Sequence, residues 1–226
     1  MTTHDSSERY LRQLLVWGDE KQQRVAESTL LVAGLGGLGA TVAQILARSG
    51  VASLHLVDDG TVALSDLHRQ SLYGECDIGR KKVLVAEERL KAINSDVHIT
   101  VQDARIDQKF YISTEVDLVV DCLDNFSSRF DLYHAVRTGQ FFVHGGVQAC
   151  QGQVLTLAKG ESQPLEEIFA GCLQPNGPIP VTPDSVFVIA GLMCNEIFQT
   201  IFGVPKLLNR FLVIDLANLT LTFLEV

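Results

Sequence analysis

This 226-residue sequence has neither paired cysteines nor an excess of positive charge. Its five cysteines are scattered, and no two of them form a CxxC pair. Unpaired cysteines of this kind are typical of a reducing compartment, so we expect a cytoplasmic protein. The formal net charge of −9 argues against a nucleic-acid binder that works through a general basic surface. The cysteines are Cys76, Cys122, Cys150, Cys172 and Cys194.

Repeats and low-complexity tracts are not seen in this sequence, and we expect no signal segment. The first ten residues, MTTHDSSERY, contain no apolar run. The most apolar helical stretch, residues 186–202, is interrupted by Asn195, Glu196 and Gln199. It therefore predicts a buried or interface helix rather than a membrane span, and we expect no membrane association.

The most informative stretch covers residues 30–59. An apolar run at 30–33 predicts a buried parallel strand, and the helical spacing of Val42, Ile45 and Leu46 predicts a helix after it. A second apolar run at 54–57 ends at Asp58, about twenty residues after a glycine-rich turn, as in nucleotide-binding folds. That turn fits G-x-G-x-x-G, and its glycines are Gly34, Gly36, Gly37 and Gly39.

This register of strand, glycines, helix, strand and acid predicts a nucleotide site. Glycines allow a tight turn and a close approach of backbone to phosphate, while free N–H groups at the helix start attract anions. Asp58 could accept hydrogen bonds from ribose hydroxyls. The alternative is that the glycines only pack a helix onto a sheet.

Strand and helix patterns alternate as far as residue 146. Residues 8–26 predict an amphipathic helix that is broken near Gly18. After a long loop at 59–79, the patterns predict a helix at 80–93, strands at 97–101 and 117–122, a helix at 127–137 and a short strand at 141–144 that ends at Gly145-Gly146. Such alternation is typical of an α/β fold with a Rossmann-like, doubly wound, mainly parallel sheet.

The pattern changes after residue 152. A strand is predicted at 153–158, and residues 159–183 then contain five of the six prolines without clear periodicity. That segment is either an ordered crossing loop or a flexible one. Strands predicted at 211–215 and 219–224 imply an antiparallel carboxyl end. No linker is visible, so we expect a single domain over residues 1–226.

Three features do not belong to a dehydrogenase, the class that residues 34–58 alone would favour. Arg69 follows shortly after the acid at the end of the second strand. Three cations at 80–82 lie at the start of a predicted helix, where the positive end of the helix dipole disfavours positive side chains. An anion nearby, such as a triphosphate, would explain them. Acids at 121–124 lie at the carboxyl end of a predicted strand, which is where open α/β sheets bind ligands. A carboxylate that faces phosphates there would be explained by a bound Mg²⁺ between them.

Together these motifs resemble the ThiF/MoeB/HesA adenylyltransferases, which are related to ubiquitin-activating enzymes. The resemblance covers almost the whole chain. It rests on RYLRQ at 9–13, GLGGLG at 34–39, VDD at 57–59, LSDLHRQ at 64–70, GRKKV at 79–83, and DCLDN at 121–125 with Arg129. A GQV sequence at 152–154 is similar to the strand that follows the nucleotide fold in that family.

The family implies that a protein carboxylate attacks the α-phosphorus of ATP to give an acyl-adenylate and pyrophosphate. The carboxylate commonly belongs to a ubiquitin-like sulfur carrier that ends in Gly-Gly, in thiamine or molybdopterin-type biosynthesis. This transfer depends on positioning and positive charge rather than on a protein nucleophile.

Motif matching assigns roles to individual residues. Asp58 would hold the ribose, Arg69 and Lys81 would contact phosphates, Asp124 would hold Mg²⁺, and Arg12 would reach the phosphates from the partner subunit of a homodimer. The alternatives are that Arg69, Lys81 and Arg12 are surface charges and that Asp124 only caps a helix. The other expected nucleotide contacts are Gly34, Gly36, Gly37, Gly39, Asp59, Asp66, Gln70, Asn125 and Arg129.

Departures from the family pattern affect affinity and metal content. Asp66 stands where the family usually has asparagine, and Gly60 where a second acid is common. Either could weaken ATP binding, or Asp66 could join the metal shell. The two CxxC pairs that hold a structural zinc in similar proteins are missing, so we expect no zinc.

Sulfur handling has only one candidate thiol in the proline-rich segment, Cys172. We expect Cys122 and Cys194 in the core, and the sequence leaves Cys76 and Cys150 open. Without a reactive thiol, the adenylate would pass to a separate sulfur donor. Three alternatives are a family enzyme with a non-protein substrate, such as a tRNA threonylcarbamoyladenosine dehydratase, a non-catalytic binding subunit, and an NAD-dependent oxidoreductase.

Overall fold

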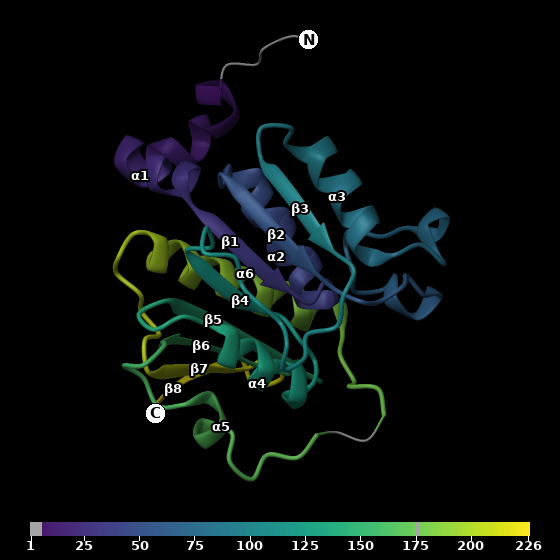
Figure 1. Cartoon of the computed structure of the whole chain (residues 1–226), viewed down its shortest axis with the longest axis vertical. Coiled ribbons are helices and arrows are strands. Elements are labelled where there is room, and N and C mark those ends of the chain that lie inside the picture. Colours follow the sequence, from purple (N-terminus) through teal and green to yellow (C-terminus); the bar gives the residue numbers. More distant parts are fainter. Residues whose placement is uncertain (1–5, 175–176) are drawn as a thin grey trace.

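The computed structural model describes residues 6–174 and 177–226, and one mixed sheet runs through it (Figure 1). The eight strands lie in the order β3-β2-β1-β4-β5-β6-β7-β8. Their bounds are Thr29–Ala33 (β1), Ser53–Val57 (β2), His98–Gln102 (β3), Leu118–Asp121 (β4), Phe141–Gln148 (β5), Gln151–Ala158 (β6), Arg210–Asp215 (β7) and Thr220–Glu225 (β8).

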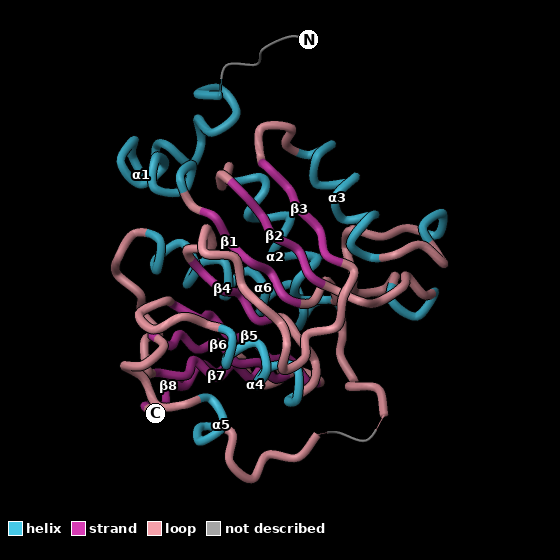
Figure 2. Tube along the Cα trace, viewed as in Figure 1, coloured by secondary structure: helices cyan, strands magenta, loops and turns pink. Residues whose placement is uncertain are grey.

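The helices and strands alternate along the first two thirds of the chain, as Figure 2 shows. The α-helices are Ser6–Glu27 (α1), Gly37–Ser49 (α2), Lys82–Ile93 (α3), Phe126–Ala135 (α4), Leu165–Ile168 (α5) and Pro183–Ile201 (α6). Two short 3₁₀ turns, Leu64–Asp66 and Glu75–Asp77, lie in the loop between β2 and α3.

Strands β3, β2, β1, β4 and β5 pair in parallel, and β6, β7 and β8 continue the sheet in antiparallel pairs. The predicted α/β class, with a mainly parallel sheet and antiparallel strands at the carboxyl end, is confirmed. The strand order reverses between β1 and β4, because β1 continues through α2 to β2 on one side while β4 lies on the other. Open α/β sheets bind ligands outside the carboxyl ends of the strands at such a point.

Each face of the sheet has its own apolar core. Helices α2, α3 and α6 cover one face, where α2 packs against both α3 and α6. Helix α4, α5 and the segment between β3 and β4 cover the other face, around Ile112, Leu132 and Phe142. Cys122 and Cys194 are both buried, which confirms their expected core positions.

Helix α1 bends at Gly18, as predicted, because this glycine adopts φ 74° and ψ 171° inside the helical segment. Tyr10 reaches Gly50 at the end of α2 so closely that a Cβ on Gly50 would lie 2.4 Å from its ring. Its hydroxyl accepts a hydrogen bond from Asn94 at 2.8 Å. These contacts dock α1 on the end of α2.

One expected boundary is wrong, because β5 does not end at Gly145-Gly146 but continues to Gln148. The two glycines lie inside the strand, in register with Val154 and Gln153 of β6. A Cβ on Gly145 would lie 2.1 Å from the sulfur of Met193 on α6. The glycine therefore marks a close approach of helix to sheet and not a turn.

Helix α6 is the one helix of the described residues that is long and apolar enough to cross a membrane. In the fold it packs against β5, β6 and α2, and ten of its residues are buried. One of them is Glu196, whose carboxylate accepts hydrogen bonds from Thr156 and from the backbone of Lys206 and Leu207. Helix α6 is thus a core element of the fold, and the hydrogen bonds of its buried Glu196 are made within the protein.

Candidate functional site: a nucleotide cavity joined to a groove

A cavity of about 560 Å³ opens at the carboxyl ends of β1, β2 and β4, where the strand order reverses. Such a volume is typical of a small-molecule site. Most of the expected nucleotide contacts line this cavity, although they come from four separate segments of the chain. They are Gly34, Gly36, Gly37, Asp58, Asp59, Asp66, Arg69, Gln70, Asp124, Asn125 and Arg129.

The glycines of the β1–α2 turn divide into two kinds. A Cβ on Gly39 would lie 1.7 Å from the carbonyl oxygen of Gly34, so Gly39 permits the helix to pack on the turn and does not line the cavity. A Cβ on Gly36 would meet nothing closer than the Gln70 amide at 3.9 Å, and it would occupy cavity space instead. Gly36 thus leaves room for a ligand at the start of α2, where free N–H groups attract phosphate.

Asp58 follows β2 and closes one wall of the cavity. Its two carboxylate oxygens accept hydrogen bonds from the backbone N–H groups of Leu35 at 2.6 Å and Gly60 at 2.7 Å. Each oxygen keeps a free lone pair, so the carboxylate can also accept hydroxyl hydrogen bonds. A Cβ on Gly60 would lie 2.8 Å from Asp58 Oδ1, so a side chain at this position would displace the Asp58 carboxylate from its present place.

The structure does not bring Lys81 to the cavity. Its ammonium pairs with Asp103 at 3.0 Å and donates to the Asp59 carbonyl at 3.1 Å, and its side chain is 42% exposed. The next residue, Lys82, lines the cavity and has a side chain only 13% exposed. Lys81 is the N-cap residue of α3, and Lys82 begins the helix and faces the other way.

The three cations at the start of α3 all have carboxylate partners. Arg80 pairs with Asp77 and Glu88, Lys81 with Asp103, and Lys82 with Asp66 at 3.4 Å. These acids offset the unfavourable helix dipole without a bound anion. The cations alone are therefore no sign of a triphosphate, and only Lys82 is placed to meet one.

Asp66 is buried and connects several polar groups of the cavity wall. One carboxylate oxygen accepts from Gln70 at 2.8 Å and from Arg69 at 3.4 Å. The other accepts from the backbone of Ala63 at 3.1 Å and lies 3.4 Å from Lys82. The negative charge of Asp66 is thus compensated by Arg69 and Lys82, and Asp66 in turn orients these two cations. The carboxylate is therefore not free to repel a phosphate.

Asp124 is exposed at the opposite wall and has no cationic partner among the described residues. Asn125 beside it caps α4, because its side-chain oxygen accepts from Ser128 at 2.9 Å. The helix-capping role therefore belongs to Asn125, and the Asp124 carboxylate is available for another purpose.

Magnesium fits this wall only together with a substrate. In residues 6–174 and 177–226, no three His, Cys, Asp or Glu side chains lie together as a metal cage. Mg²⁺ is commonly held by one or two carboxylates plus substrate phosphates, and Asp124 offers one carboxylate at the edge of the cavity. The donor set matches a metal that binds along with a nucleotide.

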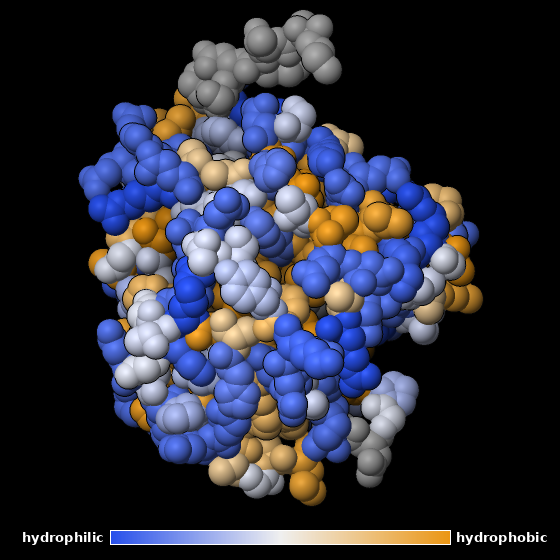
Figure 3. Space-filling view, in the orientation of Figure 1, coloured by the Kyte–Doolittle hydropathy of each residue, from blue (hydrophilic) through white to orange (hydrophobic). Residues whose placement is uncertain are grey.

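Arg12 lies on α1, outside the cavity, and is exposed. Its neighbours in the RYLRQ motif are anchored, since Arg9 donates to the Ile93 carbonyl and Gln13 to the Ser49 carbonyl. The same helix exposes Leu15 and Val16 to 79% each, and apolar atoms are visible among polar ones over α1 in Figure 3. Arg12 therefore does not serve the cavity of its own chain.

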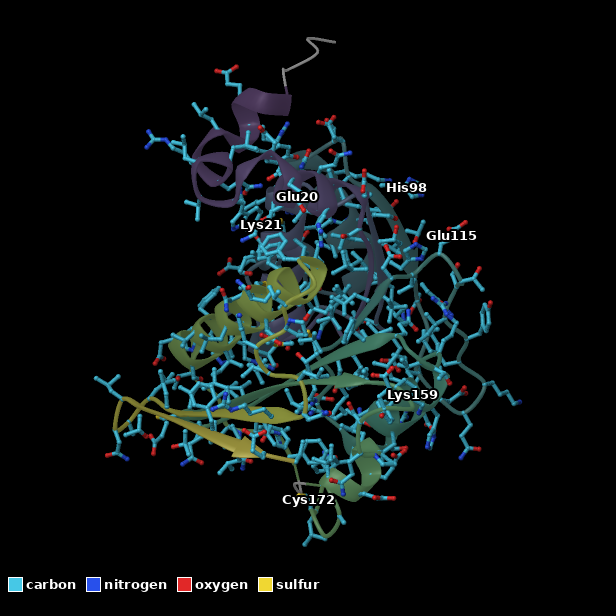
Figure 4. All side chains as sticks on the ribbon, turned by 90° about the vertical axis from the view of Figure 1, so that its left-hand side faces the viewer. Glu20, Lys21, His98, Glu115, Lys159 and Cys172 are labelled. Atoms are coloured by element: carbon cyan, nitrogen blue, oxygen red, sulfur yellow. The ribbon has the colours of Figure 1, made fainter. Side chains whose placement is uncertain are left out.

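A groove of about 420 Å³ joins the cavity on the side of β5 and β6. Asp124, Arg129, Val147 and Ile179 line both hollows, so the two meet at Asp124. Amide side chains are frequent along the groove: Gln148, Gln151, Gln153 and Gln174. Cys172 also lines it, exposed on the loop after α5 and far from Glu20 and Lys21 of α1 in Figure 4.

The described part of the proline-rich segment is tied to the cavity through Gln174. Its side-chain oxygen accepts from the backbone N–H of Phe126 at 3.0 Å, and its amide donates to the carbonyl of Asp124 at 3.3 Å. This favours the ordered alternative for residues 159–174, while residues 175 and 176 lie outside the described part. Gln174 thus supports the same turn that carries Asp124.

A buried polar cluster lies between the cavity and the groove. Asp121, at the end of β4, and His144 of β5 are both fully buried, with 2.7 Å between Asp121 Oδ2 and His144 Nδ1. Arg129 Nη1 lies 3.0 and 3.1 Å from the two ring nitrogens, and its Nη2 donates to the Leu123 carbonyl. Arg129 is thus held mainly by the protein.

The cluster shifts the pKa values of both titrating partners. Burial raises the pKa of Asp121, but Arg129 and His144 outweigh it, so this pKa lies below the ordinary value. Burial lowers the pKa of His144, and Arg129 lowers it further against the effect of Asp121. The cluster therefore holds an ionised Asp121, an ionised Arg129 and a neutral His144.

Sequence reasoning missed four residues of the site: Lys82, Arg105, Gln174 and His144. Lys82 had a signal, because GRKKV contains the lysine and valine in the fourth and fifth positions of the family's GxxKV pattern. Arg105 lines the cavity from the loop after β3, where no motif marks it. Gln174 and His144 act through contacts with distant segments, which local patterns do not reveal.

Comparison with known proteins identifies the family. The profile described as "ThiF family" matches residues 10–226. The chain is 33% identical over 90% of its length to a sulfur carrier protein adenylyltransferase of Thermus thermophilus, of which it covers 81%. It is 35% identical over 88% of its length to a molybdopterin-synthase adenylyltransferase of Escherichia coli, of which it covers 83%.

Solved structures agree on the fold. The crystal structure of E. coli MccB superposes with a TM-score of 0.84 at 20% identity, and the match spans the whole chain and 70% of MccB. That identity is informative for the fold alone. The family match covers nearly the entire sequence and includes the cavity, its glycine turn and the groove. The chain therefore belongs to the ThiF family.

Proposed function

We propose that this protein is an adenylyltransferase that uses ATP and Mg²⁺ to activate the carboxyl-terminal glycine of a ubiquitin-like sulfur-carrier protein. The observation that carries the proposal is the junction at Asp124 of a nucleotide-sized cavity and an amide-lined groove. The names of the relatives supply the substrate class, with thiamine or molybdopterin-type biosynthesis as the setting. The cytoplasm is the proposed location.

In the proposed reaction, a carboxylate oxygen of the carrier attacks the α-phosphorus of ATP. The bond from that phosphorus to the bridging oxygen breaks, and pyrophosphate leaves with the electron pair. Asp58 would hold the ribose, the turn at Gly36 would leave space for phosphates, and Arg69 and Lys82 would stabilise the charge on the phosphate oxygens. Mg²⁺ held by Asp124 would supply further positive charge.

We assign to Lys82 the phosphate contact that motif matching gave to Lys81. Lys82 lines the cavity and is positioned by Asp66, whereas Lys81 is engaged with Asp103 and a backbone carbonyl. A buried, oriented cation is a better electrostatic catalyst than a solvated one, because its attraction to phosphate is less screened.

The groove suits an extended peptide. Its floor includes Gly146 and Gly152, neither of which has a side chain that could enter the groove. Glutamine amides along its walls can donate to and accept from a peptide backbone. A tail that ends in Gly-Gly would present its carboxylate at Asp124 without side-chain obstruction.

Pyrophosphate exchange tests this proposal directly. With a carrier ending in Gly-Gly, labelled pyrophosphate should enter ATP, because adenylation is reversible. Lys82→Ala and Asp124→Asn should each lower the exchange rate by about 10²–10³, the typical loss of one electrostatic contact in such a site. Lys81→Ala is the matched control and should lose less than about tenfold, since exposed ion pairs are worth little.

The controls separate the alternatives. A carrier that lacks its last glycine should support no exchange, and Cys172→Ser should exchange at the wild-type rate because adenylation involves no thiol. A binding subunit would give no exchange with any carrier. An equal loss in Lys81→Ala and Lys82→Ala would contradict the lysine assignment.

We also propose a homodimer in which Arg12 completes the partner's cavity. Three residues of its motif anchor α1, and Arg12 is exposed beside apolar Leu15 and Val16, which suits an interface. Arg12→Ala and Lys82→Ala chains should each be inactive alone, and a mixture should regain activity because one of the two sites in the mixed dimer is then intact. The exchange assay checks this, and no recovery despite demonstrated subunit exchange would place Arg12 outside the partner's site.

A further inference from the structure

His144 has a strictly defined hydrogen-bonding state in the buried cluster. Asp121 Oδ2 lies 2.7 Å from its Nδ1, so Nδ1 carries the proton that the carboxylate accepts. The charges of Asp121 and Arg129 already compensate each other, and a protonated imidazole would add an unpaired positive charge at a fully buried position. The ring is therefore neutral, and its Nε2 is an acceptor.

That acceptor faces two donors, Arg129 Nη1 at 3.1 Å and the amide of Gln153, which lines the groove. Gln153 Nε2 lies 3.1 Å from His144 Nε2, so the amide nitrogen donates to the ring. Gln153 Oε1 has no hydrogen-bond partner among the described residues and is not buried. The ring thus fixes which end of the amide is occupied, because an acceptor at Nε2 admits only the NH₂ group.

We propose that His144 is a positioning residue that orients the Gln153 amide, so that Gln153 Oε1 accepts a hydrogen bond from a main-chain N–H of the acyl substrate. This inference rests on the proposed adenylation of a protein tail and names the recognition of that tail. A peptide backbone supplies N–H donors, whereas the carboxylate of a small organic acid does not. The groove therefore selects a peptide amide a short distance before the reacting carboxylate.

The surroundings of His144 keep this orientation fixed. Asp121 lies on β4, Arg129 on α4 and Gln153 on β6, while the Phe169 ring meets the imidazole edge to face at 5.2 Å between centroids. A Cβ on Gly146 would lie 3.1 Å from Gln153 Nε2, so this glycine also leaves space for the amide. Asp121 and Gln153, which lie at the two ring nitrogens, are thus held in place by two different strands.

The spectroscopic test reads the ring directly. In protein labelled with ¹⁵N-histidine, the His144 signals are those missing from His144→Gln, and at pH 7 they should report a neutral ring protonated at Nδ1. A ring protonated at Nε2, or a charged ring, would overturn the inference even if adenylation is demonstrated. This measurement does not depend on ATP, metal or turnover.

The functional test exchanges one atom of the substrate. Carrier proteins are prepared in which the N–H of the last or of the preceding glycine is replaced by an ester oxygen, and their binding is measured by calorimetry alongside KM in pyrophosphate exchange. Wild-type protein should bind one of the two ester carriers about two- to tenfold more weakly than the amide carrier, the usual worth of one neutral hydrogen bond.

The variants identify the acceptor. Gln153→Met, which has the same length but no acceptor, should lose this discrimination, raise KM for the carrier and leave KM for ATP unchanged. His144→Leu should show the same pattern because the amide is no longer oriented. Thr156→Val removes a buried hydrogen bond of the same strand, to Glu196, and should keep full discrimination.

The outcomes separate the two proposals. No exchange with either amide or ester carrier would refute adenylation, while the tautomer and the calorimetric discrimination would still decide the role of His144. Equal binding of all three carriers to wild-type protein, or discrimination that survives in Gln153→Met, would overturn the inference about the groove.

Discussion

The two halves of the sheet build the site in different ways. The parallel half, strands β1 to β4, brings glycines, Asp58 and Asp124 together because the carboxyl ends of its strands all meet at one edge. The antiparallel half, strands β5 to β8, contributes a groove whose walls come from a hairpin and a loop. The parallel topology brings together most of the residues that line the nucleotide site, whereas the groove requires the folded hairpin and loop.

Glycines show the same contrast between the halves. In the parallel half, Gly39 is required by a backbone oxygen at 1.7 Å from its hypothetical Cβ. In the antiparallel half, Gly145 is required by the side chain of Met193 at 2.1 Å. A backbone atom of a tight turn has nowhere to go, but a methionine side chain can change rotamer.

The largest expected effect is that of Gly39→Ala. The turn must open to admit the methyl group, so we expect a loss of stability above the roughly 1–3 kcal/mol that is typical of overpacking. Gly145→Ala should cost no more than that range. Urea unfolding of the two variants compares them, and equal losses would show that the antiparallel half is as rigid as the glycine turn.

Gly36→Ala sharpens the contrast within the same turn. Its methyl group would enter the cavity without a clash, so stability should be preserved while ATP no longer raises the melting temperature.

A smaller effect is expected at the joint between the halves, where His144 of β5 meets Asp121 of β4. The folded-state pKa of His144 lies below its ordinary value because of burial and Arg129, so between these two pKa values the unfolded chain binds a proton that the folded protein does not. The free energy of unfolding should therefore fall as the pH drops below about 6.5, by up to about 1.4 kcal/mol per pH unit.

The control is His144→Gln, which removes this titration. Its unfolding free energy should depend less on pH between 6.5 and 5 than that of the wild type, as measured by urea unfolding at several pH values. His55 has a lowered pKa as well, but it contributes equally to both proteins. Parallel pH curves would mean that His144 does not titrate in this range.

Local patterns predicted most elements of the parallel half. Apolar runs, capping residues and the glycine turn are determined by interactions within a few residues, so β1, α2 and β2 lie where they were expected. The exception is the end of β5, because Gly145 was interpreted as part of a turn. Its role is instead to allow the close approach of α6, which the local sequence does not show.

The sequence by itself determined the fold class, the family and the cavity wall built from the glycine turn, Asp58, Arg69 and Asp124, because each of these lies in a contiguous motif. The GxxKV pattern points to Lys82, and the tertiary structure showed how the two lysines differ, since the direction of each side chain depends on Asp103 and Asp66, which come from other loops. Only the tertiary structure decided the partners of His144, which come from β4, α4 and β6. Contacts across the sheet are set by packing of distant segments, and no local pattern encodes them.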